Sequence, residues 1–110
     1  MASRARTAAA IALLAALPCA VQADAEGRRL FTGLTPACGL CHTLKDAGAT
    51  GAVGPSLDEL RPDRERVIKA LRNGVGQMPP FAHLSEAQIE ALASWMAQAH
   101  GGLAQIVYEN

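Results

Sequence analysis

The 110-residue chain is predicted to form a small all-α domain in which three main helices and long loops surround a large apolar group. Apolar residues recur at helical spacing in three segments, and no segment alternates apolar and polar residues as a half-buried strand would. Aromatic residues make up only 4% of the chain, and much of the remaining apolar content is alanine, which buries little area. A domain this small commonly needs an additional source of stability. The polypeptide alone therefore supplies too little core.

The N-terminal residues 1–23 are predicted to be a signal peptide that is cleaved on export. Arg4 and Arg6 precede an apolar run, and a small-x-small pattern at the end of that run is typical of a cleavage site. The apolar run is shorter than the roughly 20 residues that span a membrane, so we expect no stable membrane insertion after cleavage. The alternative is a lipid anchor attached to Cys19.

Cleavage would leave residues 24–110 as the folded domain, with two cysteines instead of three. This part keeps all ten acidic residues and eight of the ten basic ones, so its net charge is about −2. Binding to nucleic acid would require a concentrated basic face, which the sequence lacks. We therefore expect no binding to nucleic acid. We also expect the protein to be a monomer.

The first predicted helix covers residues 24–34 and has an apolar face formed by Leu30, Phe31 and Leu34. The second begins after Asp63, which can cap it, and ends at Asn73 and Gly74. Its apolar stripe consists of Val67, Ala70 and Leu71. Its basic side chains fall largely on the other side and indicate a solvated face, with a docking patch as the alternative: Arg61, Arg64, Lys69 and Arg72.

The third predicted helix has the clearest boundaries. Ser85 and Gln88 match a capping box, and Leu84 and Ile89 can form a hydrophobic staple across the start of the helix. Gly101-Gly102 is expected to end the helix. Its inward face is predicted to consist of Ile89, Leu92, Trp95, Met96 and Ala99. Two long loops, residues 47–60 and 74–83, separate the three helices.

The pattern Cys-x-x-Cys-His at residues 38–42 is the strongest chemical signal in the chain. A thioredoxin-like redox pair expects a βαβ context, which is not visible. A structural zinc site needs four ligands, and the chain has no second cysteine pair to complete one. The remaining common use of this pattern is covalent attachment of haem. Cys38 and Cys41 would add to the two vinyl groups of the porphyrin, and His42 would bind the iron as its proximal ligand.

Four motifs, "CGLCH", "GPSL", "NGVGQMPPF" and "LSEAQIEALASWM", occur in the order found in class I c-type cytochromes, and the chain resembles this family over about residues 26–99. The resemblance implies a cytochrome c fold around one covalent haem c with its iron. It also implies that Gly27 and Phe31 of the first helix and Trp95 of the last helix grip the haem edge. Phe31 stands seven residues before Cys38, about one helical turn more than is usual in the family.

Further contacts to the haem follow from the same resemblance. A ligating histidine normally donates its second N–H to a fixed acceptor, and the resemblance implies that the carbonyl of Pro55 accepts it from His42. Leu57 is expected to pack against the porphyrin. A plain turn at Gly54-Pro55, with no role toward His42, is the alternative. Apolar and small residues are expected around the exposed haem edge, including Phe81, Val75, Leu40 and Ala37.

Met78 is predicted to be the distal iron ligand. It lies in a loop directly before two prolines that can hold its thioether in place, and it matches the axial Met-Pro of the family. Met96 falls at helical spacing with Ile89 and Leu92 and is therefore assigned to the core. His83 would allow bis-histidine ligation, although its place beside the capping box is typical of a surface loop. His100 is a further candidate from the sequence alone.

Histidine and methionine ligation fills both axial positions of the iron and raises its reduction potential. The sequence therefore predicts a periplasmic one-electron carrier, not an enzyme, that shuttles electrons between a dehydrogenase or membrane complex and a terminal acceptor. Its partners would be redox proteins in transient complexes, and the loop and last-helix pattern is similar to cytochromes that serve sulfite-oxidising dehydrogenases or photosystems. The alternatives are a haem subunit of a larger dehydrogenase, and a haem enzyme or gas sensor with a labile sixth ligand.

Overall fold

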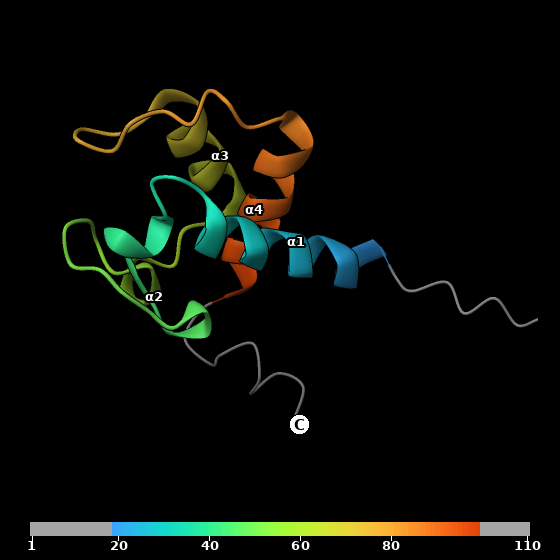
Figure 1. Ribbon diagram of the computed structural model, residues 1–110, viewed down its shortest axis with the longest axis horizontal. Helices are drawn as coiled ribbons and strands as arrows, with labels where there is room; N and C mark the ends of the chain where they lie inside the picture. The colour runs from blue at the N-terminus through green and yellow to red at the C-terminus, as the bar shows by residue number, and fades with distance from the viewer. Residues whose placement is uncertain (1–18, 100–110) are drawn as a thin grey trace, which may run out of the picture.

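The computed structural model describes residues 19–99, which form four α-helices, two 3-10 helices and one two-stranded sheet (Figure 1). In chain order the elements are α1 (Cys19–Gly33), η1 (Cys38–Leu40), β1 (Thr43–Leu44), η2 (Lys45–Ala47), β2 (Ala49–Thr50), α2 (Leu57–Leu60), α3 (Arg64–Asn73) and α4 (Glu86–Gln98). Helix α4 packs against both α1 and α3, so the last helix of the described chain lies against the first.

The crossing of α1 and α4 requires a glycine. A Cβ atom at Gly27 would lie 2.3 Å from the Cβ of Trp95 and 2.6 Å from the carbonyl oxygen of Ala91, so no other residue fits without a shift of the helices. Beside this contact the rings of Phe31 and Trp95 meet at a centroid distance of 5.5 Å and an interplanar angle of 60°. Tilted aromatic pairs of this kind add to the stability of a core. The unusual spacing between Phe31 and Cys38 therefore does not prevent the predicted pairing of the two helices.

Helix α3 begins and ends as its sequence predicts. The carboxylate of Asp63 accepts a hydrogen bond from the backbone N–H of Arg66 at 2.8 Å, and Gly74 follows the last turn. Two ion pairs connect the outer face of α3 to α4: Arg64 with Glu90, and Arg72 with Glu86. All four side chains are largely exposed, so each pair contributes little to stability. Two of the basic residues predicted to lie on a solvated face are nevertheless neutralised by α4.

The capping box of α4 is confirmed. Ser85 accepts a hydrogen bond from the backbone N–H of Gln88, and the side chain of Gln88 accepts one from the backbone N–H of Ser85 at 2.9 Å. Leu84 and Ile89, the predicted staple, are both buried. The helix ends at Gln98. The predicted stop at Gly101-Gly102 lies outside the described residues, as does His100.

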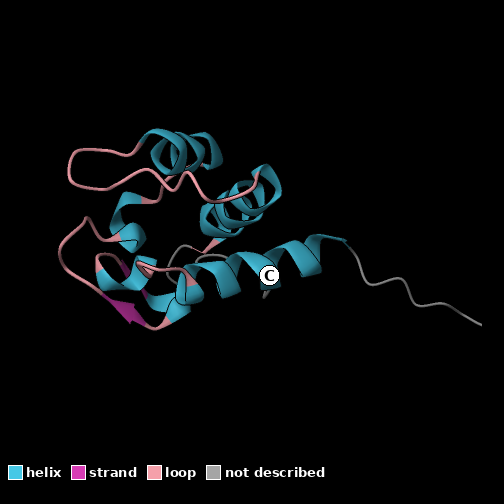
Figure 2. Ribbon diagram, turned by 45° about the horizontal axis from the view of Figure 1, so that its top comes forward, coloured by secondary structure: helices cyan, strands magenta, loops and turns pink. Residues whose placement is uncertain are grey.

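Two predictions about the architecture need correction. The chain is mostly helical but not all-α, because β1 and β2 form a short antiparallel hairpin in which Thr43 pairs with Thr50 and Leu44 with Ala49 (Figure 2). Gly48 makes the hairpin possible, since it adopts a left-handed conformation at φ 63° that glycine tolerates best. The three predicted main helices correspond to α1, α3 and α4, and within the described residues a further single turn of helix, α2, forms inside the predicted loop 47–60. Both elements are too short to produce a periodic sequence pattern.

The first helix also starts earlier than predicted, at Cys19 instead of Asp24, and ends one residue earlier, at Gly33. Within the described residues, no helix is both long enough and apolar enough to span a bilayer. The buried core gathers where α1, α3 and α4 meet, and it consists of Leu30, Phe31, Leu44, Leu57, Val67, Ile68, Leu71, Phe81, Leu84, Ile89, Leu92, Ala93, Trp95 and Ala99. The described core includes no buried polar side chain.

Candidate functional site

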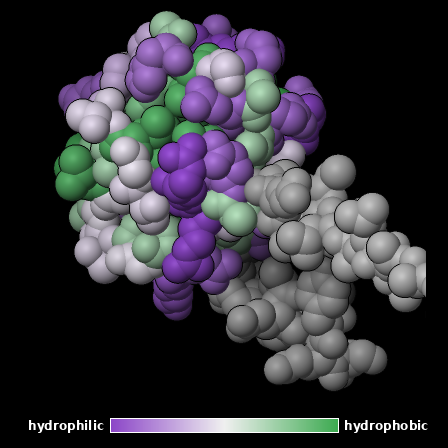
Figure 3. All heavy atoms as spheres, turned by 45° about the vertical axis from the view of Figure 1, so that its right-hand side comes forward, coloured by the Kyte–Doolittle hydropathy of each residue, from purple (hydrophilic) through white to green (hydrophobic). Residues whose placement is uncertain are grey.

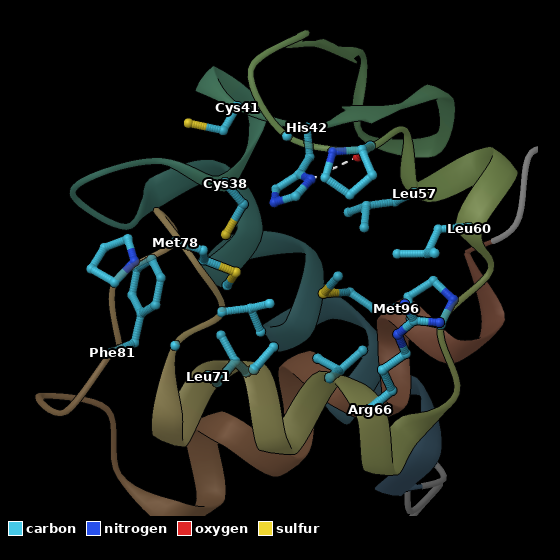
Figure 4. Close-up of a pocket in the computed structure, with 18 of the residues that line it drawn as sticks. Cys38, Cys41, His42, Leu57, Leu60, Arg66, Leu71, Met78, Phe81 and Met96 are labelled. Carbon is cyan, nitrogen blue, oxygen red and sulfur yellow. Dashed lines mark hydrogen bonds between the residues drawn. The ribbon is translucent and has the colours of Figure 1, made fainter.

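A cavity of about 710 Å³ lies between the Cys-x-x-Cys-His segment, helix α3 and the turn that carries Met78 (Figure 4). Its size falls in the range of about 300 to 1,000 Å³ that is usual for cofactor sites. Cys38, Cys41, His42 and Met78 all line it. The structure therefore brings together in one apolar space the four side chains that the sequence predicts to hold a haem.

Cys38 is the first residue of η1 and Cys41 follows its last, and both lie on one side of the cavity (Figure 4). Both thiols are free and half-buried. The pKa of the Cys38 thiol is raised to about 11, mainly by burial and less by the neighbouring Cys41, while a backbone hydrogen bond acts in the opposite direction. Redox-active cysteines have the opposite property, a lowered pKa that favours the thiolate. The environment of Cys38 therefore argues against a thioredoxin-like disulfide centre.

The orientation of His42 is fixed by the loop that follows β2. Its Nδ1 lies 2.7 Å from the carbonyl oxygen of Pro55. Because a carbonyl can only accept a hydrogen bond, Nδ1 must carry the hydrogen, and Nε2 keeps its lone pair free for a metal. This is the contact that the family resemblance implies for these two residues. Figure 4 shows the bond and the imidazole directed into the cavity.

Two glycines allow the loop to pass this close to the motif. A Cβ at Gly54 would lie 2.5 Å from Cε1 and 2.8 Å from Nδ1 of His42, and one at Gly51 would lie 2.6 Å from the carbonyl oxygen of Gly39. The N–H of Gly54 also donates to the carbonyl of Cys41 at 2.6 Å. The glycine-rich stretch is thus a tightly packed support for the imidazole. The sequence predicted only a long loop here.

The opposite wall is a tight turn that presents Met78. Val75 and Met78 exchange two backbone hydrogen bonds of 3.0 and 2.9 Å. Gly74 precedes the turn with φ 71° and ψ 169°, a conformation almost confined to glycine, and a Cβ there would lie 2.6 Å from the carbonyl oxygen of Met78. The next segment is held to α3 by a hydrogen bond of 2.7 Å from the N–H of Phe81 to the carbonyl of Leu71. These contacts hold the backbone, while the thioether itself is free to reach a metal.

Met96 also lines the cavity, although the sequence assigned it to the core. Its side chain is partly buried and packs against the core cluster, so Met96 contacts both the core and the cavity. Figure 4 shows its sulfur and that of Met78 both within the site. His83 does not line the cavity, and its ring instead lies 5.9 Å from that of Phe81. Among the described methionines and histidines other than His42, the two methionines are therefore the ones that line the cavity and can supply the sixth ligand.

The predicted packing residues divide into two groups. Phe31, Leu57, Phe81 and Pro55 line the cavity. Trp95 does not: its side chain occupies the crossing of α1 and α4 against Gly27 and Phe31, and its contact with a haem stays a prediction.

Sequence reasoning missed most of one wall. Helix α3 contributes apolar and basic side chains to the cavity, and α2 and the segment after it add Leu60 and Pro62. The helical period of Val67, Ala70 and Leu71 did show an apolar stripe, but it did not show whether that stripe faces protein or a cofactor. The α3 residues that line the cavity are Arg66, Val67, Lys69, Ala70, Leu71 and Asn73.

The donor set fits a covalent haem better than a bare metal ion. Among residues 19–99, no cluster of three or more histidine, cysteine, aspartate or glutamate side chains could hold an ion. The cavity instead offers two thiols on one side, one oriented imidazole and one thioether, with mainly apolar groups between them. Cys38 and Cys41 would form the thioether bonds, and the bound haem would supply an iron that changes oxidation state by one electron.

Comparison with known proteins agrees with this chemistry. The family described as "Cytochrome C oxidase, cbb3-type, subunit III" matches residues 22–96. The crystal structure of the c-type cytochrome SorU from Sinorhizobium meliloti is similar to the chain with a TM-score of 0.72 and 48% sequence identity, covering 74% of this chain and 94% of that one. No curated protein matches. The chain thus belongs to the c-type cytochromes, and it binds haem c with its iron covalently.

Proposed function

We propose that the protein is a one-electron carrier in which His42 and Met78 are the axial ligands of the haem iron. The observation that carries this proposal is the pair of opposed supports: an imidazole with Nε2 free on one wall and a thioether on a constrained turn of the other. With both axial positions filled, no site is left at the iron for a substrate or a gas. Histidine and methionine ligation also favours the reduced state.

The residues of the chain have distinct tasks in this function. Pro55 orients the imidazole and makes it a stronger ligand by accepting its second hydrogen. Apolar side chains such as Leu57, Leu71 and Phe81 exclude water from the cavity. A dry and rigid environment limits the rearrangement that accompanies each change of charge, which suits repeated electron transfer.

Replacement of each methionine by alanine tests the ligand assignment. Met78→Ala should abolish the weak sulfur-to-iron charge-transfer absorption of the oxidised protein, lower the midpoint potential and allow rapid binding of carbon monoxide to the reduced protein. Met96→Ala is the matched control, and it should retain the absorption while destabilising the fold by about 2 kcal/mol or more. Loss of the absorption in Met96→Ala alone would reverse the assignment. Rapid carbon monoxide binding by the unaltered protein would favour the enzyme or sensor alternative.

The partner surface is proposed to be the apolar rim, defined by Leu40, Val53 and Val75. These are the exposed large hydrophobic residues of the described chain, with 67, 77 and 63% of their surface accessible. Val53 and Val75 line the haem cavity from opposite walls, and Leu40 belongs to η1 between the two cysteines. Figure 3 shows apolar residues gathered on one side of the molecule, with polar residues over much of the remaining visible face. Such a surface suits a transient complex of small area.

The basic side of α3 is a weaker candidate for docking. Arg64 and Arg72 are already paired with acidic residues of α4, which reduces their attraction for an acidic partner. The partner we propose is a redox protein, a dehydrogenase or membrane complex, that meets the rim through apolar contacts. Membership of a family described as an oxidase subunit supports the alternative of a fixed haem subunit. The size of the native complex in a gentle extract would distinguish the two.

Export to the periplasm is also proposed, on the basis of the sequence at residues 1–23. The signal pattern supports it, and thioether attachment of haem agrees with an exported protein. Intact mass tests this part of the proposal: the isolated protein should begin at Asp24 and carry one haem, and retention of residues 1–23 would contradict it.

A further inference from the structure

The bond that orients His42 has a companion between the same two segments of the chain. His42 Nδ1 lies 2.7 Å from the carbonyl oxygen of Pro55 (Figure 4), and the backbone N–H of Lys45 donates to Oδ2 of Asp58 at 3.0 Å. Both bonds connect residues that are 13 apart in the sequence, so the second bond repeats the first at a position further along both segments. The segment that follows His42 is therefore joined to the segment that follows Pro55 at two points.

Apolar packing accompanies the second bond. Leu44, directly before Lys45, is 1% exposed, and Leu57, directly before Asp58, is 5% exposed. Helix α2 also packs against β1. Leu57 lines the haem cavity beside His42 (Figure 4), whereas Asp58 is not among the lining residues. The hydrogen bond of Asp58 can therefore influence the haem only through the backbone that it holds.

The carboxylate of Asp58 serves a helix other than its own. Lys45 is the first residue of η2, and the residue before it, Leu44, makes no side-chain hydrogen bond that would cap this helix. Asp58 supplies the missing acceptor from a distant part of the chain. Its other oxygen, Oδ1, is buried and has no hydrogen-bond partner among the described residues. A buried acceptor without a partner costs free energy, so an acid at this position calls for an explanation beyond stability.

We propose that Asp58 is a positioning residue for the proximal ligand: by holding the backbone of Lys45, it keeps the carbonyl of Pro55 within hydrogen-bonding distance of His42. The inference rests on the proposed function, because it concerns the ligand that His42 provides. A hydrogen bond from the second ring nitrogen increases the basicity of a ligating imidazole. A more basic ligand stabilises the oxidised iron, so Asp58 should keep the midpoint potential lower than it would be without this bond.

The charge of Asp58 acts in the same direction as its hydrogen bond. An ionised carboxylate near the haem disfavours the added electron and also lowers the potential. The variants must therefore separate the bond from the charge. Glu59, the next residue along α2, is exposed and does not line the cavity, so its replacement measures the effect of a nearby charge alone.

The first test compares three variants of the holoprotein. Asp58→Asn keeps an oxygen that can accept from Lys45 but removes the charge, Asp58→Ala removes both, and Glu59→Gln removes only a neighbouring charge. The midpoint potential is measured together with the solvent exchange of the His42 Nδ1 proton, by NMR of the reduced protein. Asp58→Ala should raise the potential more than either of the other two variants. Only in Asp58→Ala should the proton exchange several-fold faster, because the loop that shields it opens more often.

The second test breaks the same bond from the donor side and leaves the carboxylate of Asp58 in place. Lys45→Pro removes the N–H at the first residue of η2, where the fixed φ of proline, about −65°, suits the start of a helix. Leu44 before it is extended, with φ −152° and ψ 110°, as a residue before proline prefers to be. Lys45→Gln is the matched control, because it loses the same charge and keeps the N–H. Lys45→Pro should have the higher potential of the two and the faster exchange at His42.

The exchange rates decide the outcome. Unchanged exchange of the His42 proton in both Asp58→Ala and Lys45→Pro would overturn the proposal. Equal rises in potential in Asp58→Ala, Asp58→Asn and Glu59→Gln would also overturn it, in favour of a plain charge effect. Failure of the proposed function would look different, because the unaltered reduced protein would then lack the His42 signals that the haem ring current shifts.

Discussion

The two walls of the cavity hold their iron-facing side chains in different ways. On the His42 wall the protein contacts the ring itself, through the carbonyl of Pro55 at 2.7 Å and the close backbone of Gly54. On the Met78 wall the hydrogen bonds hold only the backbone, through the turn from Val75 and the following bond of Phe81, and the side chain is held by apolar packing against the core. The direction of the imidazole is therefore set before any metal binds. The position of the thioether depends on a turn and on a long, adaptable side chain.

This difference indicates which ligand is the easier to lose. A disturbance near His42 must displace the ring or the Cys-x-x-Cys-His backbone, and both are held by several contacts. A disturbance near Met78 needs only to open a turn closed by two hydrogen bonds. We expect damage to the His42 wall to cost the protein its fold or its haem, and damage to the Met78 wall to affect mainly the sixth ligand.

The largest effect should come from Gly54→Ala. Its Cβ would lie 2.5 Å from the imidazole, so either the ring or the loop must move, which costs about 1 to 3 kcal/mol and breaks the alignment with Pro55. We expect a sharply reduced yield of holoprotein, measured from haem absorption per mole of chain. Gly33→Ala is the control, because a Cβ there meets nothing within 4 Å. Equal yields from both variants would show that the His42 wall is not rigid.

A smaller effect is expected from Gly74→Ala on the other wall. The conformation at Gly74 should cost an alanine about 1 to 3 kcal/mol, and the Cβ would press on the carbonyl of Met78. Holoprotein should still form, but the charge-transfer absorption should weaken and carbon monoxide should bind faster. Gly76→Ala separates the two causes, since Gly76 has φ 54° but open space around its Cβ. The comparison of the walls fails if Gly74→Ala lowers the yield of holoprotein as much as Gly54→Ala does.

The smallest effect concerns docking, to which both walls contribute. Val53→Asp and Val75→Asp each place a charge on the apolar rim, one from each side of the haem. Electron self-exchange between oxidised and reduced copies, measured by NMR line broadening, should slow several-fold in either variant and change little with salt in the unaltered protein. A steep salt dependence that disappears when Arg64 and Arg72 are reversed in charge would instead place the contact on α3.

Much of the site could be predicted from the sequence, because its parts are local motifs with a definite chemistry. The Cys-x-x-Cys-His spacing predicts attachment and the proximal ligand without reference to the fold. The start of α4 followed from its capping box, since Ser85 and Gln88 satisfy each other within one turn. The bounds of α3 were equally local, with Asp63 before it and Gly74 after it.

Features that depend on distant packing could not be predicted in this way. Trp95 and Met96 are neighbours on the same helix and point in different directions, so only Met96 reaches the cavity while Trp95 packs against Gly27 at the crossing with α1. Helix α2 and the hairpin were missed because each element spans only about one period of its sequence pattern, which is too short for a repeat to appear. Gly51 and Gly54 were assigned only to a long loop, since close packing against a distant backbone leaves no signal in composition.

Cleavage after Ala23 would change the electrostatics of helix α1. In the described part of the chain this helix covers Cys19–Gly33, and it has no acidic residue in its first turn. A chain that starts at Asp24 would place Asp24 and Glu26 in that turn, where a carboxylate interacts favourably with the positive end of the helix dipole by about 0.3 to 1 kcal/mol. The two acids would also offset the new terminal ammonium group. Processing would thus create a favourable helix start directly before Gly27, the residue on which the crossing with α4 depends.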